Sequence, residues 1–226
     1  FLLNHIVNFY NTYDVDVVSN ISENSSLLDI LPKGVRRYNI PILREISLLS
    51  DIKALLLLAR HFYVKKIMIV YSVSPKAGIL SMTAARLVGV PVRVHTFTGQ
   101  VWVEKKGAMR LLLKLIDRII AKLATVVIVD SQSQRDYLIK NNIVSKEKSI
   151  VIGAGSISGV DVGRFDLRPV VRKMVREKMG VVDHIVVFLY VGRLKRDKGL
   201  FELAKAFLSI SKKTDNIALW LVGPDE

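Results

Sequence analysis

One short basic segment has residue types and spacing suited to binding an anion. It reads Val191-Gly-Arg-Leu-Lys-Arg-Asp-Lys-Gly-Leu200 and contains two glycines and four cations, which are Arg193, Lys195, Arg196 and Lys198. Glycine lets a backbone approach a ligand closely, arginine holds phosphate oxygens in a fixed fork, and lysine adds a point charge. The segment therefore predicts a diphosphate site, with a solvated basic turn as the alternative.

A strand and a helix are expected to position this segment. The run Ile185–Val191 is short, apolar and rich in β-branched residues, which predicts a buried strand. Apolar residues then recur at helical spacing at Leu200, Leu203, Ala204 and Phe207. The basic loop would thus join the carboxyl end of a strand to a helix N-terminus, where free N–H groups and a partial positive charge attract anions.

Composition limits the function classes. The chain of 226 residues has 34 Lys and Arg against 20 Asp and Glu, a net charge of +14, which favours a polyanionic partner such as nucleic acid, an acidic membrane or a phosphorylated ligand. It has no cysteine, which excludes disulfides and thiolate chemistry. No apolar run reaches the roughly 18 residues of a membrane span. Because the chain begins at Phe1 and ends directly after a strand-like run, we expect it to be truncated at both ends.

Strands and helices are expected to alternate, which predicts an α/β fold with a parallel sheet covered on both faces. The expected strands are Asp14–Ser19, Tyr38–Pro41, Lys66–Tyr71, Val92–Thr96, Thr125–Asp130, Ser149–Ile152, Ile185–Val191 and Ile217–Val222. The expected helices are Phe1–Tyr10, a helix capped by Asp51 that runs to Tyr63, one that follows Ser74-Pro75 to Leu87, then Met109–Leu123, Ser133–Lys140, Val170–Met179 and Leu200–Ser211. Ile21–Lys33 is expected to be a loop.

A glycine-rich stretch separates two expected domains. Residues 153–163 contain four glycines, which predicts a hinge and a ligand loop. We therefore expect a first domain at residues 1–166, with its hinge loop at about 153–166, and a second, incomplete domain at residues 167–226.

The order of five segments resembles the family 4 retaining glycosyltransferases, in their bacterial surface-polysaccharide branch. The segments are Ser74-Pro-Lys-Ala-Gly78, His95-Thr-Phe-Thr-Gly-Gln100, Asp130-Ser-Gln-Ser-Gln134, Gly155-Ser-Ile-Ser-Gly-Val-Asp161, and Gly192-Arg followed by Asp-Lys-Gly199. The resemblance implies a GT-B-like architecture. It would comprise an N-terminal Rossmann-like parallel-sheet domain on the acceptor side and the first part of a second Rossmann-like domain that binds the donor.

Two departures from the family pattern matter. The family's glycine-rich loop would lie before Phe1, and its paired glutamates would lie beyond Glu226. The resemblance therefore implies that this chain is inactive alone.

The resemblance also implies roles for particular residues on the donor side. Arg193 and Lys198 match the family's diphosphate-binding pair, next to Gly192, whereas Lys195 and Arg196 are expected to be solvated. Gly155 and Ser156 would line the cleft. His95 corresponds to a family histidine near the donor sugar and is the catalytic candidate; a core histidine satisfied by a neighbouring carbonyl is the alternative. No bound metal and no cofactor are expected.

On the acceptor side, Lys76 at a helix start could receive a phosphate, and Thr98 and Gly99 follow the same strand as His95. A surface lysine and a tight turn without a ligand are the alternatives. A row of cations at i, i+4, i+8 and i+12 is expected to face anionic lipid or, alternatively, only solvent. These cations are Arg110, Lys114, Arg118 and Lys122.

The sequence thus predicts a retaining glycosyltransferase that transfers a sugar from a nucleotide sugar to a lipid-linked or saccharide acceptor. The pathway would be surface polysaccharide synthesis, such as lipopolysaccharide O-antigen. We expect it to be cytoplasmic and peripheral on the inner face of the cytoplasmic membrane. The alternatives are a GT-B sugar-nucleotide epimerase and a basic nucleic-acid-binding module. Nucleic-acid binding is disfavoured because aromatic residues, 8% of the chain, are not interleaved with the basic clusters.

Overall fold

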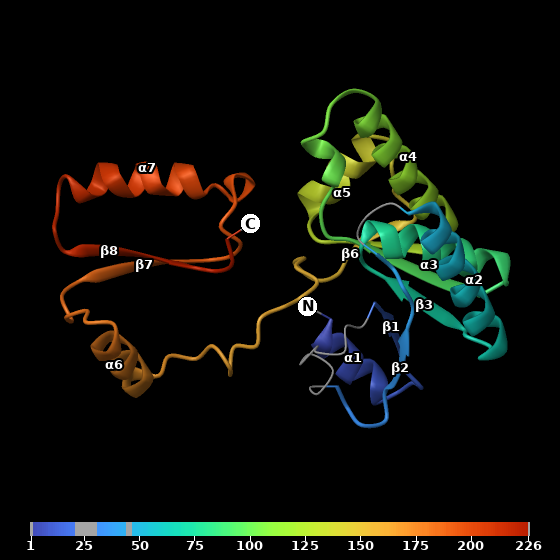
Figure 1. Ribbon diagram of the computed structural model, residues 1–226, viewed down its shortest axis with the longest axis horizontal. Coiled ribbons are helices and arrows are strands. Elements are labelled where there is room, and N and C mark those ends of the chain that lie inside the picture. Colours follow the sequence, from blue (N-terminus) through green and yellow to red (C-terminus); the bar gives the residue numbers. More distant parts are fainter. Residues whose placement is uncertain (1, 21–30, 44–46, 226) are drawn as a thin grey trace. The chain divides into compact units, whose positions relative to one another are not determined.

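The computed structural model describes residues 2–20, 31–43 and 47–225 (Figure 1). Most of the expected loop Ile21–Lys33 lies outside these ranges. The chain divides into two compact units: unit 1 is Phe1–Gly159 and unit 2 is Val160–Glu226. The division falls inside the expected hinge loop, a few residues before the boundary expected at residue 166.

Unit 1 alternates strands and helices, and its described strands pair only in parallel. Its helices are α1 (Leu3–Tyr10), α2 (Leu48–Val64), α3 (Pro75–Leu87), α4 (Gly107–Leu123) and α5 (Gln132–Lys140), with a 3-10 turn η2 (Val101–Val103). Its strands are β1 (Asp16–Ser19), β2 (Arg36–Asn39), β3 (Ile69–Ser72), β4 (Val92–Phe97), β5 (Val126–Val129) and β6 (Ser149–Val151). Strands β3, β4, β5 and β6 form one sheet in that order, and β1 pairs with β2. The predicted parallel α/β fold is confirmed.

Local sequence signals explain most element ends in unit 1. Helix α3 begins as expected, with Ser74 at the N-cap and Pro75 in the first turn. The expected cap of α2 is wrong: the helix starts at Leu48 after Ser47, and Asp51 lies inside it. The Asp51 carboxylate reaches back to accept the N–H of Ser47 at 3.3 Å, as an acidic group in a first turn can do.

The core of unit 1 lies between the four-stranded sheet and the helices. Helix α3 packs against both α2 and α4. The largest fully buried apolar side chains come from these helices, from α5, from η2 and from the strands; they include Leu58, Met82, Phe97, Trp102, Ile120, Val127, Val129 and Leu138. Because β3, β4 and β5 pair in parallel, their carboxyl ends lie at one edge of this sheet.

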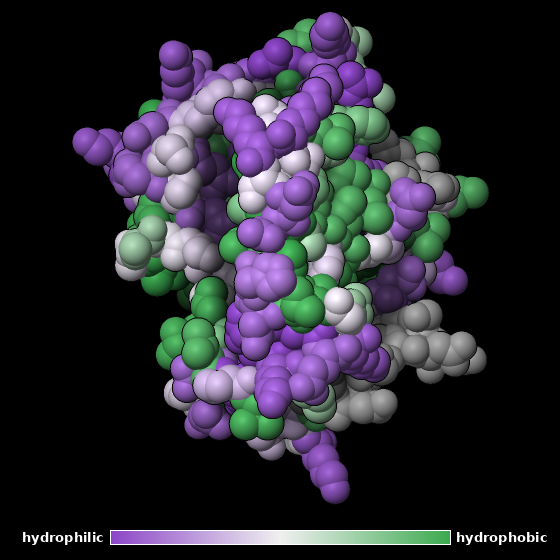
Figure 2. Space-filling view, turned by 90° about the vertical axis from the view of Figure 1, so that its left-hand side faces the viewer, coloured by the Kyte–Doolittle hydropathy of each residue, from purple (hydrophilic) through white to green (hydrophobic). Residues whose placement is uncertain are grey.

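Unit 2 has the same alternation but little burial. It consists of α6 (Pro169–Lys178), β7 (Val186–Val191), a 3-10 turn η3 (Arg196–Lys198), α7 (Leu200–Ser211) and β8 (Ile217–Val222), and β7 pairs in parallel with β8. The expectation that β7 is buried is wrong, because Leu189 is 60% and Val191 71% exposed. In the described part of unit 2, β8 is the only strand that pairs with β7, so most of its apolar surface stays uncovered. Figure 2, which turns the left-hand side of Figure 1 toward the viewer, shows hydrophobic side chains on the surface among hydrophilic ones.

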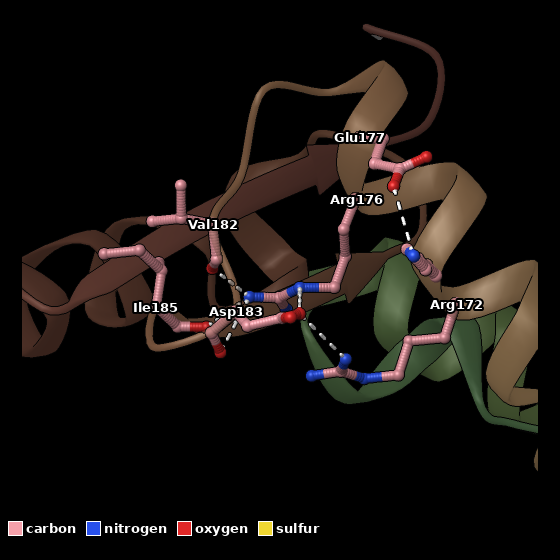
Figure 3. Close-up of polar contacts among 7 residues, drawn as sticks. Arg172, Arg176, Glu177, Val182, Asp183 and Ile185 are labelled. Carbon is pink, nitrogen blue, oxygen red and sulfur yellow. Dashed lines mark hydrogen bonds and ion pairs between the residues drawn. The ribbon is translucent and has the colours of Figure 1, made fainter.

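The one well-buried charged side chain of unit 2 is Arg176, among the residues described there. Its guanidinium donates to the main-chain carbonyls of Val182 at 2.6 Å and Ile185 at 2.8 Å (Figure 3). The Asp183 carboxylate lies 3.7 Å from Nε of the same guanidinium. Arg176 therefore ties the end of α6 to the turn that leads into β7.

Candidate functional site

The carboxyl edge of the four-stranded sheet carries polar groups from three adjacent strands. This is the edge at which open α/β sheets bind ligands. Thr96 near the end of β4 donates its hydroxyl hydrogen to the Tyr71 hydroxyl of β3 at 3.0 Å. Burial raises the pKa of Tyr71, the hydrogen bond from Thr96 opposes this rise, and the negative charge of Asp130 adds to it. Thr96 and Asp130 fall within segments that carry the family resemblance, but none of these three residues was assigned a role from the sequence, although Tyr71 and Asp130 stand at strand ends.

His95 lies inside the core of unit 1, with none of its surface exposed. It stands opposite Ser72 in the β3–β4 register, and its Nδ1 is 2.8 Å from the Ser72 hydroxyl. The edge of its ring meets Phe97 with centroids 4.7 Å apart, and a Cβ at Gly78 would come within 2.6 Å of the His95 Cε1 atom. Burial lowers the pKa of His95 to about 4, so the ring is neutral at pH 7.

These contacts favour the alternative of a core histidine, with a serine hydroxyl in place of the expected carbonyl. A wholly buried imidazole has no surface with which to touch a sugar. The catalytic role of His95 remains a prediction, and the geometry argues against it.

The loop after β4 is exposed at its tip and anchored at its base. Thr98 and Gly99 are exposed, and a Cβ at Gly99 would meet no atom within 4 Å. The anchor is Trp102, which is fully buried, donates its Nε1 hydrogen to Asp117 Oδ2 at 2.7 Å and stacks on Tyr137 with centroids 5.6 Å apart. The loop thus presents Thr98 and Gly99 to solvent from a fixed base.

The hydrogen bond between Trp102 and Asp117 places a carboxylate in the interior, where its charge is unfavourable. Burial raises its pKa to about 6, and the hydrogen bond from Trp102 only partly opposes that rise. Its carboxylate accepts the hydrogen bond of the Trp102 indole, although Asp117 lies on the same helix as the basic row of α4.

Lys76 already has an acidic partner. Its ammonium group lies 2.8 Å from the Asp51 carboxylate, which joins the first turns of α3 and α2. Both side chains are largely buried. An acceptor phosphate at Lys76 would therefore compete with Asp51, and the predicted acceptor role has no support from this geometry.

The basic row of α4 packs partly against the protein rather than facing solvent alone. Lys114 donates to the Asn141 side chain at 2.9 Å and lies over the Trp102 ring, with 4.9 Å to its centroid. Arg118 donates to the Asn142 carbonyl at 2.9 Å. Lys122 is exposed. Exposed apolar residues of α4 lie beside this row, and they include Leu111, Leu112 and Leu115.

The predicted diphosphate residues share one loop of unit 2. Arg193 and Lys198 are both exposed, and the Gly192 N–H donates to the Val222 carbonyl at 2.9 Å. Gly199 adopts a left-handed φ of 74° immediately before α7, a conformation that favours glycine. Of the two cations expected to be solvated, Lys195 is half-buried, and Arg196 lies 5.9 Å from the centroid of the Phe201 ring.

The predicted cleft residues Gly155 and Ser156 lie against the end of β5. The Ser156 N–H donates to the Asp130 carbonyl at 2.7 Å. Farther along the same loop, Asp161 accepts the Arg164 N–H at 3.0 Å and so caps a turn.

Neither a metal-binding cluster nor a membrane-spanning helix is present among the described residues. Across residues 2–20, 31–43 and 47–225, no group of three or more His, Cys, Asp or Glu could hold a metal ion. None of the described helices is long and apolar enough to cross a bilayer.

Solved structures with the same fold define its class. The chain resembles Alr3699/HepE of Anabaena in complex with UDP, with a TM-score of 0.68, 18% identity, and coverage of 93% of this chain and 53% of that one. It also resembles the UDP-GlcNAc 2-epimerase of Neisseria meningitidis bound to UDP-GlcNAc, with a TM-score of 0.66, 15% identity, and coverage of 100% and 62%. The fold is therefore the GT-B-like α/β fold with Rossmann-like parallel sheets.

Sequence comparison gives the family. Residues 11–155 match the model of the glycosyl transferase 4-like domain, so the chain belongs to that family. It is 34% identical over 184 residues to the capsular polysaccharide biosynthesis glycosyltransferase CapM of Staphylococcus aureus, which covers 81% of this chain and 48% of CapM. It is also 34% identical over 198 residues to the UDP-Gal:alpha-D-GlcNAc-diphosphoundecaprenol alpha-1,3-galactosyltransferase of Escherichia coli, covering 86% and 49%. The chain spans about half the length of these curated relatives.

Proposed function

We propose that the whole protein is a glycosyltransferase. It would transfer a sugar from a nucleotide sugar to a lipid-linked or saccharide acceptor in surface polysaccharide synthesis, with retention of configuration and without a bound metal. The observation that carries this proposal is the match of residues 11–155 to the glycosyl transferase 4-like domain. Two relatives at 34% identity, named for capsular polysaccharide synthesis and for a diphosphoundecaprenol-linked acceptor, support the acceptor class. An O-antigen pathway is one form of this proposal.

The donor diphosphate is assigned to the loop after β7. Arg193 and Lys198 are exposed there beside Gly192, and α7 begins directly after the loop with its N-terminal N–H groups. During transfer, negative charge develops on the departing nucleoside diphosphate, and cations placed at that charge lower the barrier. Figure 1 shows this loop at the turn between β7 and α7.

The acceptor is assigned to the exposed loop after β4. Thr98 can exchange hydrogen bonds with a sugar hydroxyl, and the open space around Gly99 allows close approach of a ligand. The fixed base at Trp102 would keep this loop in one arrangement.

A membrane face is assigned to the helical layer of α2 and α4, which both pack against α3. Helices α2 and α4 together contain six lysines and arginines but only two acidic residues. Of the two, Asp51 pairs with Lys76, and Asp117 is buried against Trp102. Exposed leucines lie on both helices, and they include Leu49 and Leu56 on α2 and Leu111 and Leu115 on α4. Such a surface suits the anionic inner face of the cytoplasmic membrane, where each cation contributes about 1 kcal/mol.

The geometry changes how this membrane face is best tested. Reversing Lys114 and Arg118 to Glu would also break their bonds to Asn141 and Asn142. We therefore choose the paired substitution Leu111→Ser and Leu115→Ser, with Leu208→Ser on α7, which is also exposed, as the control. The pair should reduce sedimentation with phosphatidylglycerol vesicles at least about tenfold, and phosphatidylcholine vesicles should bind little. Equal sedimentation of the pair, the control and the parent would overturn the membrane assignment.

The diphosphate loop is tested by transfer assays on the whole protein. Each charge-assisted bond to phosphate is worth about 1.5–3 kcal/mol, so Arg193→Ala or Lys198→Ala should cut turnover at least about tenfold. Lys195→Ala, from the same loop, is the matched control and should change turnover little. An equal loss of turnover in all three variants would mean that the loop acts only through its overall positive charge, without a specific diphosphate-binding pair.

The second candidate function is a sugar-nucleotide epimerase, because the fold is similar to that of a UDP-GlcNAc 2-epimerase. Analysis of the reaction products distinguishes it from a glycosyltransferase. A transferase releases nucleoside diphosphate only when an acceptor is present. An epimerase converts the nucleotide sugar without an acceptor, and that result would replace the proposed function.

A further inference from the structure

The segment by which the chain leaves unit 1 is fastened to the end of β5 by Asp130. Oδ1 of Asp130 accepts the Ile157 N–H at 2.7 Å, and its main-chain carbonyl accepts the Ser156 N–H at 2.7 Å. Two consecutive amides of the segment are thus bonded to one residue. Hydrogen bonds to a carboxylate are among the stronger ones in proteins, so this is a firm attachment.

The backbone at this attachment adopts two consecutive left-handed conformations, at Gly155 and Ser156. Gly155 has a left-handed φ of 99°, and a Cβ there would overlap the Asp130 carbonyl oxygen. Ser156, which is not a glycine, also has a left-handed φ, of 58°. Such a conformation persists where surrounding contacts hold it, and here its own N–H is held by Asp130.

Contacts on both sides reinforce the attachment. The N–H of Asp130 itself donates to the Gln134 side chain at 2.7 Å, which fixes Asp130 to α5. From α1, the His5 Nε2 lies 2.6 Å from the Ile157 carbonyl and donates to it. Residues far apart in sequence therefore hold Ile157 through both its N–H and its carbonyl.

Immediately beyond this point the chain loses such contacts. The compact unit ends at Gly159, and residues 159–170 are exposed. Val160, Val162 and Phe165 are apolar side chains in this stretch, and each is at least 70% exposed.

We infer that Asp130 is a positioning residue that sets the pivot between the two units. Asp130 holds residues 155–157 at the edge of the sheet. The backbone therefore rotates only after Ile157, within residues 158–168, and not along the whole glycine-rich stretch of residues 153–163. Given the proposed function, Asp130 would act on transfer through this segment, by fixing where the donor-binding unit starts, and without touching either substrate.

Hydrogen exchange resolved to single amides tests the attachment directly. In the parent chain, the Ser156 and Ile157 amides should be protected and those of residues 160–163 should not. Asp130→Ala should speed exchange of the Ile157 amide at least about tenfold, as expected for a lost charge-assisted bond. Asp130→Asn keeps an acceptor oxygen and should retain most of the protection, and Asp136→Ala on the exposed face of α5 should change nothing.

The exchange of Val127 and Val129 in β5 serves as the folding control. If these amides stay protected in Asp130→Ala while Ile157 is released, the attachment acts locally, as proposed. If Ile157 keeps its protection in Asp130→Ala, or if residues 160–163 are protected as strongly as Ile157 in the parent, the proposal is overturned.

Two glycines provide a second, independent test. Gly155 and Gly159 both have left-handed φ angles, of 99° and 60°, but a Cβ at Gly159 would meet no atom within 4 Å. Ala at either position would be held at a positive φ, with the larger backbone strain at residue 155, and only Gly155→Ala also collides with Asp130. Gly155→Ala should therefore release the Ser156 and Ile157 amides, and Gly159→Ala should not. Equal effects would show that the collision, and hence the attachment, is unimportant.

Transfer by the whole protein tests the positioning role. Asp130→Ala should lower kcat at least about tenfold with little change in the KM for the nucleotide sugar, and Asp130→Asn should restore most of it. Unchanged kcat in Asp130→Ala would overturn the role. Absence of transfer in the parent protein would contradict the proposed function instead, and the exchange results would still decide where the pivot lies.

Discussion

Unit 1 and unit 2 share the alternation of short apolar strands with helices but differ in how many of their apolar side chains are buried. In unit 1, four parallel strands and the helices beside them enclose large side chains such as Phe97 and Trp102. In the described part of unit 2, two parallel strands pair, and no apolar side chain there is among the buried ones. The difference teaches that an apolar, β-branched run predicts a strand but not its burial, because burial depends on how many neighbours the sheet provides.

The same two units also differ in how their polar candidates are used. In unit 1, Lys76 is bonded to Asp51 and His95 to Ser72, so both are engaged inside the protein. In unit 2, Arg193 and Lys198 are exposed on a loop. A residue type suited to chemistry is thus available to a ligand only where packing leaves it exposed.

The largest expected effect compares one phenylalanine from each unit. Phe97→Ala should cost about 3–5 kcal/mol, because Phe97 is fully buried, whereas Phe188→Ala should cost less than about 1 kcal/mol, because Phe188 is 42% exposed. The two tryptophans report the units separately, Trp102 in unit 1 and Trp220 in unit 2. Urea unfolding followed by the fluorescence of each tryptophan, with the other replaced by Phe, measures both costs. A similar loss of unfolding free energy at the two positions would contradict the difference in burial between the units.

The next effect is a pair of opposed pH dependences in unit 1. The pKa of His95 is lowered from 6.5 to about 4, so its contribution to stability is present above pH 6.5 and is lost as pH falls toward 4. The pKa of Asp117 is raised from 3.8 to about 6, so its contribution is present below pH 3.8 and is lost as pH rises through 6. Each change amounts to about 3 kcal/mol, and in the parent protein the two largely offset each other.

Single substitutions should separate these two contributions. Relative to the parent, Asp117→Asn, which keeps an acceptor for Trp102, should gain stability at pH 7 and lose that gain as pH falls from 6 to 4. His95→Gln should show the opposite trend relative to the parent across the same range. The free energy of unfolding, measured at several pH values by Trp102 fluorescence, gives both difference curves. Flat difference curves would contradict the burial of these two groups.

A smaller effect concerns the arginine that organises unit 2 in place of an apolar core. Arg176→Met removes charge-assisted bonds to the carbonyls of Val182 and Ile185, which should cost about 1.5–3 kcal/mol of local stability. Arg172→Met is the matched control: Arg172 is largely exposed, and its ion pair with Asp183 spans 3.5 Å, so it should cost at most about 1 kcal/mol. Amide exchange of residues 181–186 measures both. Equal exchange in the two variants would remove the structural role of Arg176.

Much of the fold could be predicted from the sequence because its signals are local. The proline after Ser74, the helical spacing of α4 and the alternation of short apolar runs with helices depend on neighbouring residues. The burial of β7 could not be predicted, since it depends on which other strands pair with it. The start of α2 was misplaced because Asp51 acts from inside the first turn, which spacing alone does not reveal.

The candidate site was less predictable because its residues meet only through the sheet. The segment Asp130-Ser-Gln-Ser-Gln134 was noticed as a motif, but its bond to Ile157 joins positions 27 residues apart. The exposure of the loop at Arg193 could be anticipated from its glycines and charges. The complete burial of His95 could not, since it follows from Ser72, Gly78 and Phe97 closing around the ring.

Residue-resolved hydrogen exchange of the 226-residue chain tests the contrast between the two units most directly. Amides of β4 and β5, around Phe97 and Val127, should exchange only through unfolding of unit 1. Amides of β7 and β8 should exchange orders of magnitude faster, through local opening that leaves unit 1 folded. Equal and strong protection of β7, β8, β4 and β5 would contradict this account, because it would mean that unit 2 has a core of its own.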